Sequence, residues 1–265
     1  QGGIPVPYKY IQTKNGFDID IDNLTKSISD KTKVLIINNY QNPLSASSSV
    51  EELKSLAEIA NKHNLWVLSD DAYFEIRYSD EDPKSIVNLP GMRQRTVILY
   101  TFSKKFAMTG WRIGASIGPV PVIKHMARFN VNDESCTNHF IQHALASMFN
   151  EKVDFGKAIL DTLRKRRDLC LKKLNSIDGI NVPTPNSTFY LFPNVTEIMH
   201  RKGYKNLEKF RTDAMKSTGV SFCTREHFGS PHQNEEQKYI RLAYSGINRQ
   251  DISIGLDRFI TWINS

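Results

Sequence analysis

The chain has 265 residues, of which 40% are hydrophobic and 24% charged, with a net charge of +7 at pH 7. This composition is ordinary for a folded, water-soluble protein of one large or two modest domains, and no apolar run is long enough to predict a membrane span. The three cysteines lie far apart and predict no disulfide framework, which favours a reducing, cytoplasmic location. Because Lys and Arg are dispersed, we expect small anionic metabolites as partners, and no nucleic acid or membrane.

The first half of the chain predicts a parallel α/β sheet. Residues 34–37 and 65–68 are short apolar runs typical of buried parallel strands. Between them, two overlapping serine–glutamate pairs within residues 48–52 predict a capped helix start, and apolar residues then follow at helical spacing. A strand–helix–strand unit of this kind places both strands in one parallel sheet.

Polar residues follow these strands, at the edge where open α/β sheets bind ligands. Asn42, followed by a proline, comes after the first strand, and Asp70, Asp71 and Tyr73 come after the second. Each of these groups alone indicates only a turn. Their meaning depends on the segment that follows.

Segment 101–114, which a β-rich run enters, is the most informative part of the chain. It contains Lys104 and Arg112, with the hydroxyl residues Thr101 and Ser103 beside the lysine. Burial at a strand end disfavours the charged ammonium of a lysine and so favours a nucleophilic amine. The planar fork of an arginine suits a phosphate. A lysine beside a phosphate anchor predicts a covalently held phosphorylated aldehyde, which is pyridoxal phosphate.

The rest of the chain predicts a long helix and a smaller α/β unit. The charged amphipathic stretch that starts at residue 153 predicts an interdomain helix, so we expect domains at 1–152 and 153–265. In the second domain Arg241 lies on an alternating strand that precedes a final helix. The sheet segments predicted there are residues 179–185, 188–193, 219–223 and 239–244.

Two other clusters carry no predicted chemistry. His139 and His143 have a helical spacing that suits a metal ion, but no third ligand accompanies them, so we expect no metal site. Residues 164–167 form a basic cluster that we interpret as the solvated face of the long helix.

The segment Ser-Lys-Lys-Phe-Ala-Met-Thr-Gly-Trp-Arg-Ile-Gly, residues 103–114, resembles the cofactor-lysine signature of the class I/II aminotransferases. These are the fold-type-I pyridoxal-phosphate enzymes, and the match is typical of their bacterial and archaeal aspartate-aminotransferase-like branch. Segment 69–73 resembles the family's Ser-Asp-Glu-x-Tyr, with Asp71 in place of glutamate. Segment 42–45 keeps the Asn-Pro of Asn-Pro-Thr-Gly, and segment 224–229 keeps only the Phe-Gly of Pro-Gly-Ser-x-Phe-Gly.

The resemblance implies a role for each candidate residue. Lys104 would hold the cofactor as a Schiff base and shuttle protons, and Asp70 would pair with the pyridine nitrogen. Tyr73 and Asn42 would contact the 3′-oxygen, and Asn42 with Arg241 would bind the substrate α-carboxylate. The expected phosphate contacts come from Thr101, where the family usually has Ser or Gly, Ser103 and Arg112.

The resemblance also implies a fold, an activity and an oligomeric state. The fold would be an α/β/α large domain with a mostly parallel sheet, truncated at its N-terminus, plus a small C-terminal α/β domain. The activity would be ping-pong transfer of an amino group between an L-amino acid and a 2-oxo acid, in a homodimer with the active site at its interface. Two alternatives stay open, a pyridoxal-phosphate-dependent carbon–sulfur β-lyase and the ligand-sensing domain of a transcription regulator. The sequence does not select the amino acid substrate.

Overall fold

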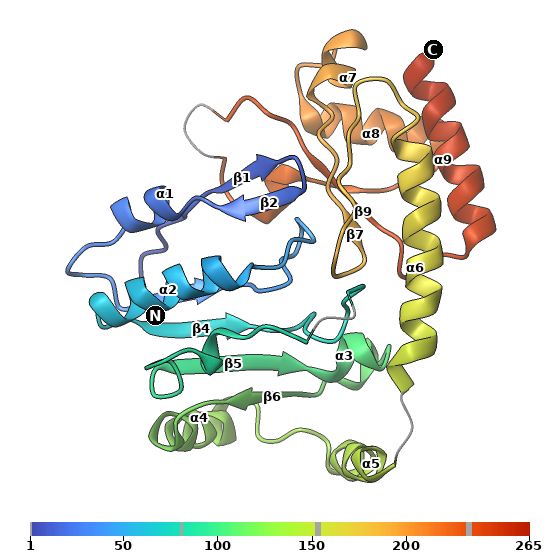
Figure 1. The fold of residues 1–265 in the computed structure, drawn as a ribbon. Coiled ribbons are helices and arrows are strands. Elements are labelled where there is room, and N and C mark those ends of the chain that lie inside the picture. Colours follow the sequence, from blue (N-terminus) through green and yellow to red (C-terminus); the bar gives the residue numbers. More distant parts are fainter. Residues whose placement is uncertain (1, 80–81, 152–154, 232–234) are drawn as a thin grey trace. The chain divides into compact units, whose positions relative to one another are not determined.

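The computed structural model describes residues 2–79, 82–151, 155–231 and 235–265 (Figure 1). The chain forms two compact units. The first consists of Gln1–Thr13, Phe17–Gln41 and Ala46–Ile159, and the second of Lys14–Gly16, Asn42–Ser45 and Leu160–Ser265. Asn42 therefore groups with the C-terminal part of the chain, although in sequence it lies between two elements of the first unit.

The first unit is built on a four-stranded sheet of order β3-β4-β5-β6. The first three strands are parallel and the last is antiparallel to its neighbour, which confirms the predicted mostly parallel α/β sheet. Asp70 pairs with Leu99, and Thr101 pairs with Gly114, so segment 101–114 starts beside the end of β4. A Cβ at Gly114 would lie 2.6 Å from the Tyr100 carbonyl oxygen, so only glycine fits there. The strands are β3 (Val34–Ile37), β4 (Trp66–Asp70), β5 (Thr96–Thr101) and β6 (Gly114–Ile117).

Helix α2 (Val50–Lys62) covers one face of this sheet (Figure 1). Its apolar side chains, including Leu56, share a core with Leu35 and Ile37 of β3. Of the two predicted serine–glutamate pairs, the second makes the capping box, with the Ser49 hydroxyl accepting from the Glu52 backbone N–H at 3.0 Å.

Shorter elements and three further helices complete the described part of the first unit and lead out of it. The helices α4 (Val120–Asp133), α5 (His139–Asn150) and α6 (Phe155–Leu174) follow the sheet, and the predicted helix start at residue 153 lies outside the described residues. No helix of the described residues is both long and apolar enough to cross a bilayer. The shorter elements are β1 (Tyr10–Thr13), β2 (Gly16–Ile19), α1 (Ile21–Lys26) and α3 (Phe102–Lys105).

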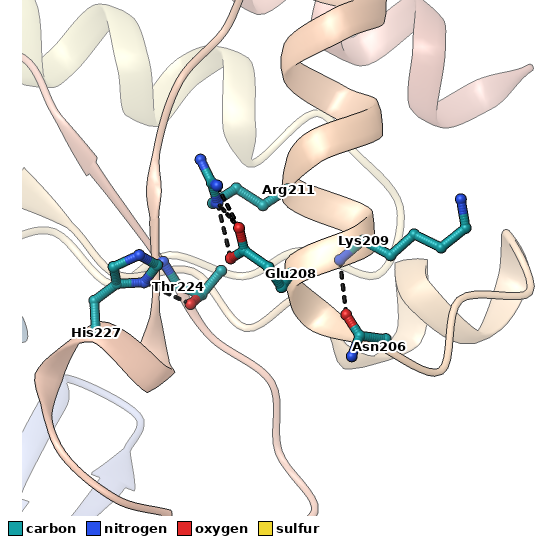
Figure 2. Close-up of polar contacts among 6 residues, drawn as sticks. All are labelled: Asn206, Glu208, Lys209, Arg211, Thr224 and His227. Atoms are coloured by element: carbon teal, nitrogen blue, oxygen red, sulfur yellow. Dashed lines mark hydrogen bonds and ion pairs between the residues drawn. The ribbon is translucent and has the colours of Figure 1, made fainter.

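The second unit contains an antiparallel sheet of order β7-β9-β8. The sheet is smaller than predicted, because no strand forms at residues 179–185 and residues 219–222 precede β8 as irregular chain. Helix α8 begins where the Asn206 side chain accepts from the Lys209 backbone N–H at 2.7 Å (Figure 2). The elements are β7 (Tyr190–Leu191), α7 (Thr196–Arg201), α8 (Leu207–Thr218), β8 (Cys223–Thr224), β9 (Ile240–Ala243) and α9 (Arg249–Asn264).

Candidate active site

Asp70 and Tyr73 lie where β4 ends. Asp70 is the last residue of the strand, and its carboxylate accepts hydrogen bonds from the Asn38 side-chain amide and from the Ala72 backbone N–H, both at 3.2 Å. Asp70 is half-buried, whereas the Tyr73 side chain is buried. Asn38, which follows β3, is a residue that sequence reasoning missed. Its position immediately after a parallel strand was the available signal.

Asp71 has different surroundings from Asp70. Burial alternates from Ser69 to Asp71, and the Asp71 carboxylate is buried where it accepts from the Ser69 hydroxyl at 2.8 Å. Burial raises the pKa of Asp71 to about 6, the Ser69 hydrogen bond opposes this rise, and the neighbouring Asp70 charge adds to it. Asp71 therefore belongs to the interior of the unit, and Asp70 is the better placed acid for a ligand.

Lys104 and Lys105 are adjacent in α3 but contact different partners. The Lys104 ammonium lies 5.6 Å from the centre of the Tyr73 ring. The Lys105 ammonium instead forms an ion pair with Glu75 at 3.2 Å. The structure thus brings Lys104 to Tyr73, which follows β4.

The three predicted phosphate residues lie around the start of α3. The Thr101 hydroxyl oxygen accepts from the Ser103 backbone N–H at 3.2 Å, and Ser103 is buried. Arg112 lies near the start of α3, because its neighbour Ile113 accepts a hydrogen bond at its carbonyl from the Phe102 backbone N–H at 3.4 Å. Arg112 itself is exposed, has φ 56°, and donates to the Thr109 carbonyl at 3.0 Å. Two hydroxyls and one guanidinium make a donor set that suits a phosphate.

Asn42 and Arg241 meet within the second unit although 199 positions separate them, and Arg241 Nη1 donates to Asn42 Oδ1 at 2.9 Å. The guanidinium also lies 4.4 Å from the ring centre of Tyr190 and 4.6 Å from that of Phe228. Arg241 Nη2 contacts Cys223 Sγ at 3.5 Å. Sequence reasoning missed these three neighbours, although Phe228 stood in the retained Phe-Gly pair.

The described residues contain no group of three or more His, Cys, Asp or Glu residues that could hold a metal ion. The His139 and His143 rings lie 4.6 Å apart on α5. The groups around Lys104 are an amine, a phenol, a carboxylate, and the hydroxyl and guanidinium donors near the start of α3. This combination suits an organic phosphate ligand.

Comparisons with known proteins agree with this donor set. A family model described as aminotransferase class I and II matches residues 1–259. The chain is 33% identical to the aspartate aminotransferase of Sulfolobus acidocaldarius, over 99% of this chain and 64% of that protein. It is also 33% identical to aromatic-amino-acid aminotransferase 2 of Thermococcus litoralis, over 92% and 60%. The solved structure of an aromatic aminotransferase from Pyrococcus horikoshii superposes with a TM-score of 0.85 at 30% identity, over 94% and 64%. The chain thus spans less than two thirds of these relatives' lengths.

Proposed function

Because the chain belongs to the class I and II aminotransferase family, we propose that the protein moves an amino group between an L-amino acid and a 2-oxo acid by a ping-pong mechanism. The observation that carries the proposal is the position of the Lys104 amine over the Tyr73 ring, beside the end of β4 that bears Asp70. The named relatives are aminotransferases, so the comparisons do not favour the carbon–sulfur lyase or the regulator.

The residues of the first unit fit pyridoxal 5′-phosphate. Lys104 would hold its aldehyde carbon, Asp70 its ring nitrogen, Tyr73 its 3′-oxygen, and the set of Thr101, Ser103 and Arg112 its phosphate. When bound, the cofactor supplies an electron sink for bonds at the substrate α-carbon. The Asp70 carboxylate stabilises positive charge on a ring nitrogen, and the Asn38 amide orients that carboxylate.

Lys104 is the proposed acid and base. Once released from the cofactor, the neutral Lys104 amine would take a proton from the substrate α-carbon and would deliver it to the former aldehyde carbon of the cofactor. The Tyr73 ring centre lies 5.6 Å from Lys104 Nζ, and the Tyr73 phenol would contact the 3′-oxygen of the cofactor.

Arg241 and Asn42 are the proposed contacts of the α-carboxylate. A guanidinium binds a carboxylate through two parallel hydrogen bonds, which fixes the orientation of the substrate as well as its affinity. The Asn42 side chain already accepts one Arg241 N–H, so the two groups are arranged together. Asn42 would also reach the 3′-oxygen.

The proposal also covers the domain division, the assembly and the location of the protein. We propose the division into a cofactor-binding domain, 1–152, and an interdomain helix with a small domain, 153–265. A cytoplasmic homodimer with its active site at the subunit interface is the proposed assembly, acting on amino acids and 2-oxo acids.

The decisive test compares the two adjacent lysines. The protein would be mixed with pyridoxal phosphate, reduced with borohydride and digested, and the labelled peptide identified by mass spectrometry. We expect the label on Lys104, its loss in Lys104→Ala and its retention in the matched control Lys105→Ala. Label on Lys105, or equal label in both variants, would contradict the proposal.

Product analysis tests the reaction class. We expect a new amino acid and a 2-oxo acid in equal amounts when an amino acid and a second 2-oxo acid are supplied together. Pyruvate and a thiol formed from a sulfur amino acid, with no amino transfer, would instead identify a lyase.

A further inference from the structure

We propose that Phe228 and Tyr190 clamp the two faces of the Arg241 guanidinium, and that a Thr224–His227 contact holds Phe228 in this clamp. Phe228, Tyr190 and His227 are then positioning residues for carboxylate binding. The inference rests on the proposed role of Arg241. It adds an explanation of how the Arg241 guanidinium is oriented.

The clamp is inferred from two distances that share the Arg241 guanidinium. The guanidinium carbon lies 4.4 Å from the Tyr190 ring centre and 4.6 Å from the Phe228 ring centre. A guanidinium stacks on aromatic faces while its N–H groups point outward in its own plane. Two rings therefore restrict the guanidinium to one plane and leave its edge for hydrogen bonding.

The edge contacts leave donors for a ligand. Nη1 donates to Asn42 Oδ1 at 2.9 Å, and Nη2 donates to Cys223 Sγ at 3.5 Å. Each terminal nitrogen of a guanidinium carries two N–H groups, so the described residues occupy only one N–H on each. A carboxylate accepts this pattern with its two oxygens.

Within the described residues Arg241 has no ion-pair partner, unlike Arg211 of helix α8. Arg211 Nε donates to both carboxylate oxygens of Glu208, at 2.8 and 2.9 Å (Figure 2). Arg241 contacts an amide, a thiol and two rings, and it forms no ion pair within the described part of the chain. Of these two arginines, Arg241 is the one that retains its attraction for an anionic ligand.

The loop that carries Phe228 is closed by its own side chains. The Thr224 backbone N–H donates to His227 Nδ1 at 3.2 Å, and Thr224 Oγ1 lies 2.8 Å from the same nitrogen (Figure 2). Thr224 ends β8 and pairs with Ile240, while its neighbour Cys223 pairs with Arg241. The contact therefore ties the turn before Phe228 to the strand pair that carries the arginine.

Two further features fix the exit of this loop. Arg225 donates to the Gly229 carbonyl at 2.9 Å and forms an ion pair with Glu235 at 2.9 Å. Gly229 has φ 118° and ψ 168°, a conformation that residues with a Cβ avoid. The Phe228 ring meets Phe192 edge-on at 6.4 Å, which limits its rotation.

The test uses a matched ligand pair on the protein loaded with pyridoxal phosphate. Binding of 3-phenylpropionate and of the neutral 3-phenylpropanamide would be measured by isothermal titration calorimetry. For Phe228→Leu we expect carboxylate affinity to fall about tenfold, from the loss of one cation–π face. Amide binding should not change, and Phe228→Tyr should restore carboxylate affinity.

Two variants separate a positioning role from a structural one. His227→Ala leaves Phe228 in the chain but removes the Thr224 contact, and we expect a smaller loss, about threefold. The double variant Lys209→Gln/Asp213→Asn removes an ion pair of helix α8 and should leave carboxylate affinity unchanged. In steady-state amino transfer, Phe228→Leu should raise KM while kcat stays near the parent value, because the clamp acts on binding.

The outcomes distinguish a failure of the clamp from a failure of the proposed role of Arg241 in carboxylate binding. If Arg241→Lys weakens carboxylate binding and Phe228→Leu does not, the clamp is wrong and the carboxylate role stands. If Arg241→Lys leaves carboxylate binding unchanged, the proposed role of Arg241 fails first. Should Phe228→Leu not fold, as judged by circular dichroism, His227→Ala carries the same comparison, and unchanged affinity there would overturn the inference.

Discussion

Asp70 and Asp71 are neighbours in the chain, yet the fold gives their carboxylates different environments. Asp70 is half-buried and accepts from the Asn38 amide, whereas Asp71 is buried and accepts from the Ser69 hydroxyl. The alternation of an extended strand sends consecutive side chains to opposite faces, which separates the acid proposed to face a ligand from an interior one. Lys104 and Lys105 also have different partners, Tyr73 and Glu75, although these lysines lie on helix α3 and not on a strand.

We predict that Asp71→Asn stabilises the protein at neutral pH. The folded-state pKa of Asp71 is about 6 against an ordinary 3.8, so the folded state binds the extra proton between these values. The contribution of this proton to the stability of the folded state is nearly complete below about pH 4, and it is lost as the pH rises through about 6. The variant should gain about 3 kcal/mol of unfolding free energy at about pH 7.5, and less than about 1 kcal/mol at about pH 4.

Urea unfolding at both pH values checks this gain. A gain of equal size at the two pH values would show that ionisation of Asp71 is not its cause. Asn can still accept from the Ser69 hydroxyl, so the local hydrogen bond is kept.

Asp70→Asn is predicted to have the opposite profile. Removing the charge that we propose to pair with the cofactor should slow amino transfer by about 100-fold, a typical loss for one preorganised electrostatic contact. Unfolding free energy should change little because Asp70 is only half-buried. Single-turnover absorbance measurements on both aspartate variants provide the comparison, and a greater loss in Asp71→Asn would exchange the roles of the two acids.

At the scale of elements, α8 and α9 contain glycines in two different situations. Gly219 ends α8 with φ 74°, the left-handed conformation that closes a helix and that glycine adopts without strain. Gly255 lies inside α9, where an added Cβ would meet the Val220 side chain at 3.4 Å. The first glycine is required by backbone geometry, whereas the second only lowers helix propensity.

We therefore predict opposite effects for the same substitution at these sites. Gly219→Ala should lower the unfolding free energy by about 1 kcal/mol, since nothing crowds the site but its φ is unfavourable for alanine. Gly255→Ala should raise it by about 0.5–1 kcal/mol through helix propensity. Thermal unfolding of the two variants measures both signs. A loss at Gly255 would mean that Val220 cannot move aside.

For the molecule as a whole, sequence patterns predicted what depends on short range. Segment 101–114, the parallel strands and the start of α2 at Ser49 all follow from local chemistry and period. The surroundings of Arg241 could not be read in this way, because Asn42 reaches it from 199 positions away. Segment 179–185 has apolar alternation but forms no strand, since such patterns fit irregular buried chain equally well.

The sheet of the first unit also has a feature that only the structure reveals, because it depends on what covers each face. On β3, Leu35 and Ile37 are buried beneath α2, whereas Val34 is 49% and Ile36 59% exposed. Trp66, which pairs with Val34 on the next strand, is 41% exposed. Parallel sheets are normally covered on both faces, and a contiguous exposed apolar patch favours association.

We predict that this patch makes the chain bind hydrophobic dyes and self-associate. The double variant Val34→Thr/Ile36→Thr should reduce dye fluorescence and shift sedimentation velocity profiles toward monomer, because threonine keeps β propensity while adding a hydroxyl. Its unfolding free energy should stay within about 0.5 kcal/mol of the parent, as for other surface changes. The control Leu35→Ala alters the opposite, buried face of β3 and should instead lose about 3 kcal/mol through an internal cavity. If the threonine variant bound dye as strongly as the parent, the exposed face of β3 would not be the source of association.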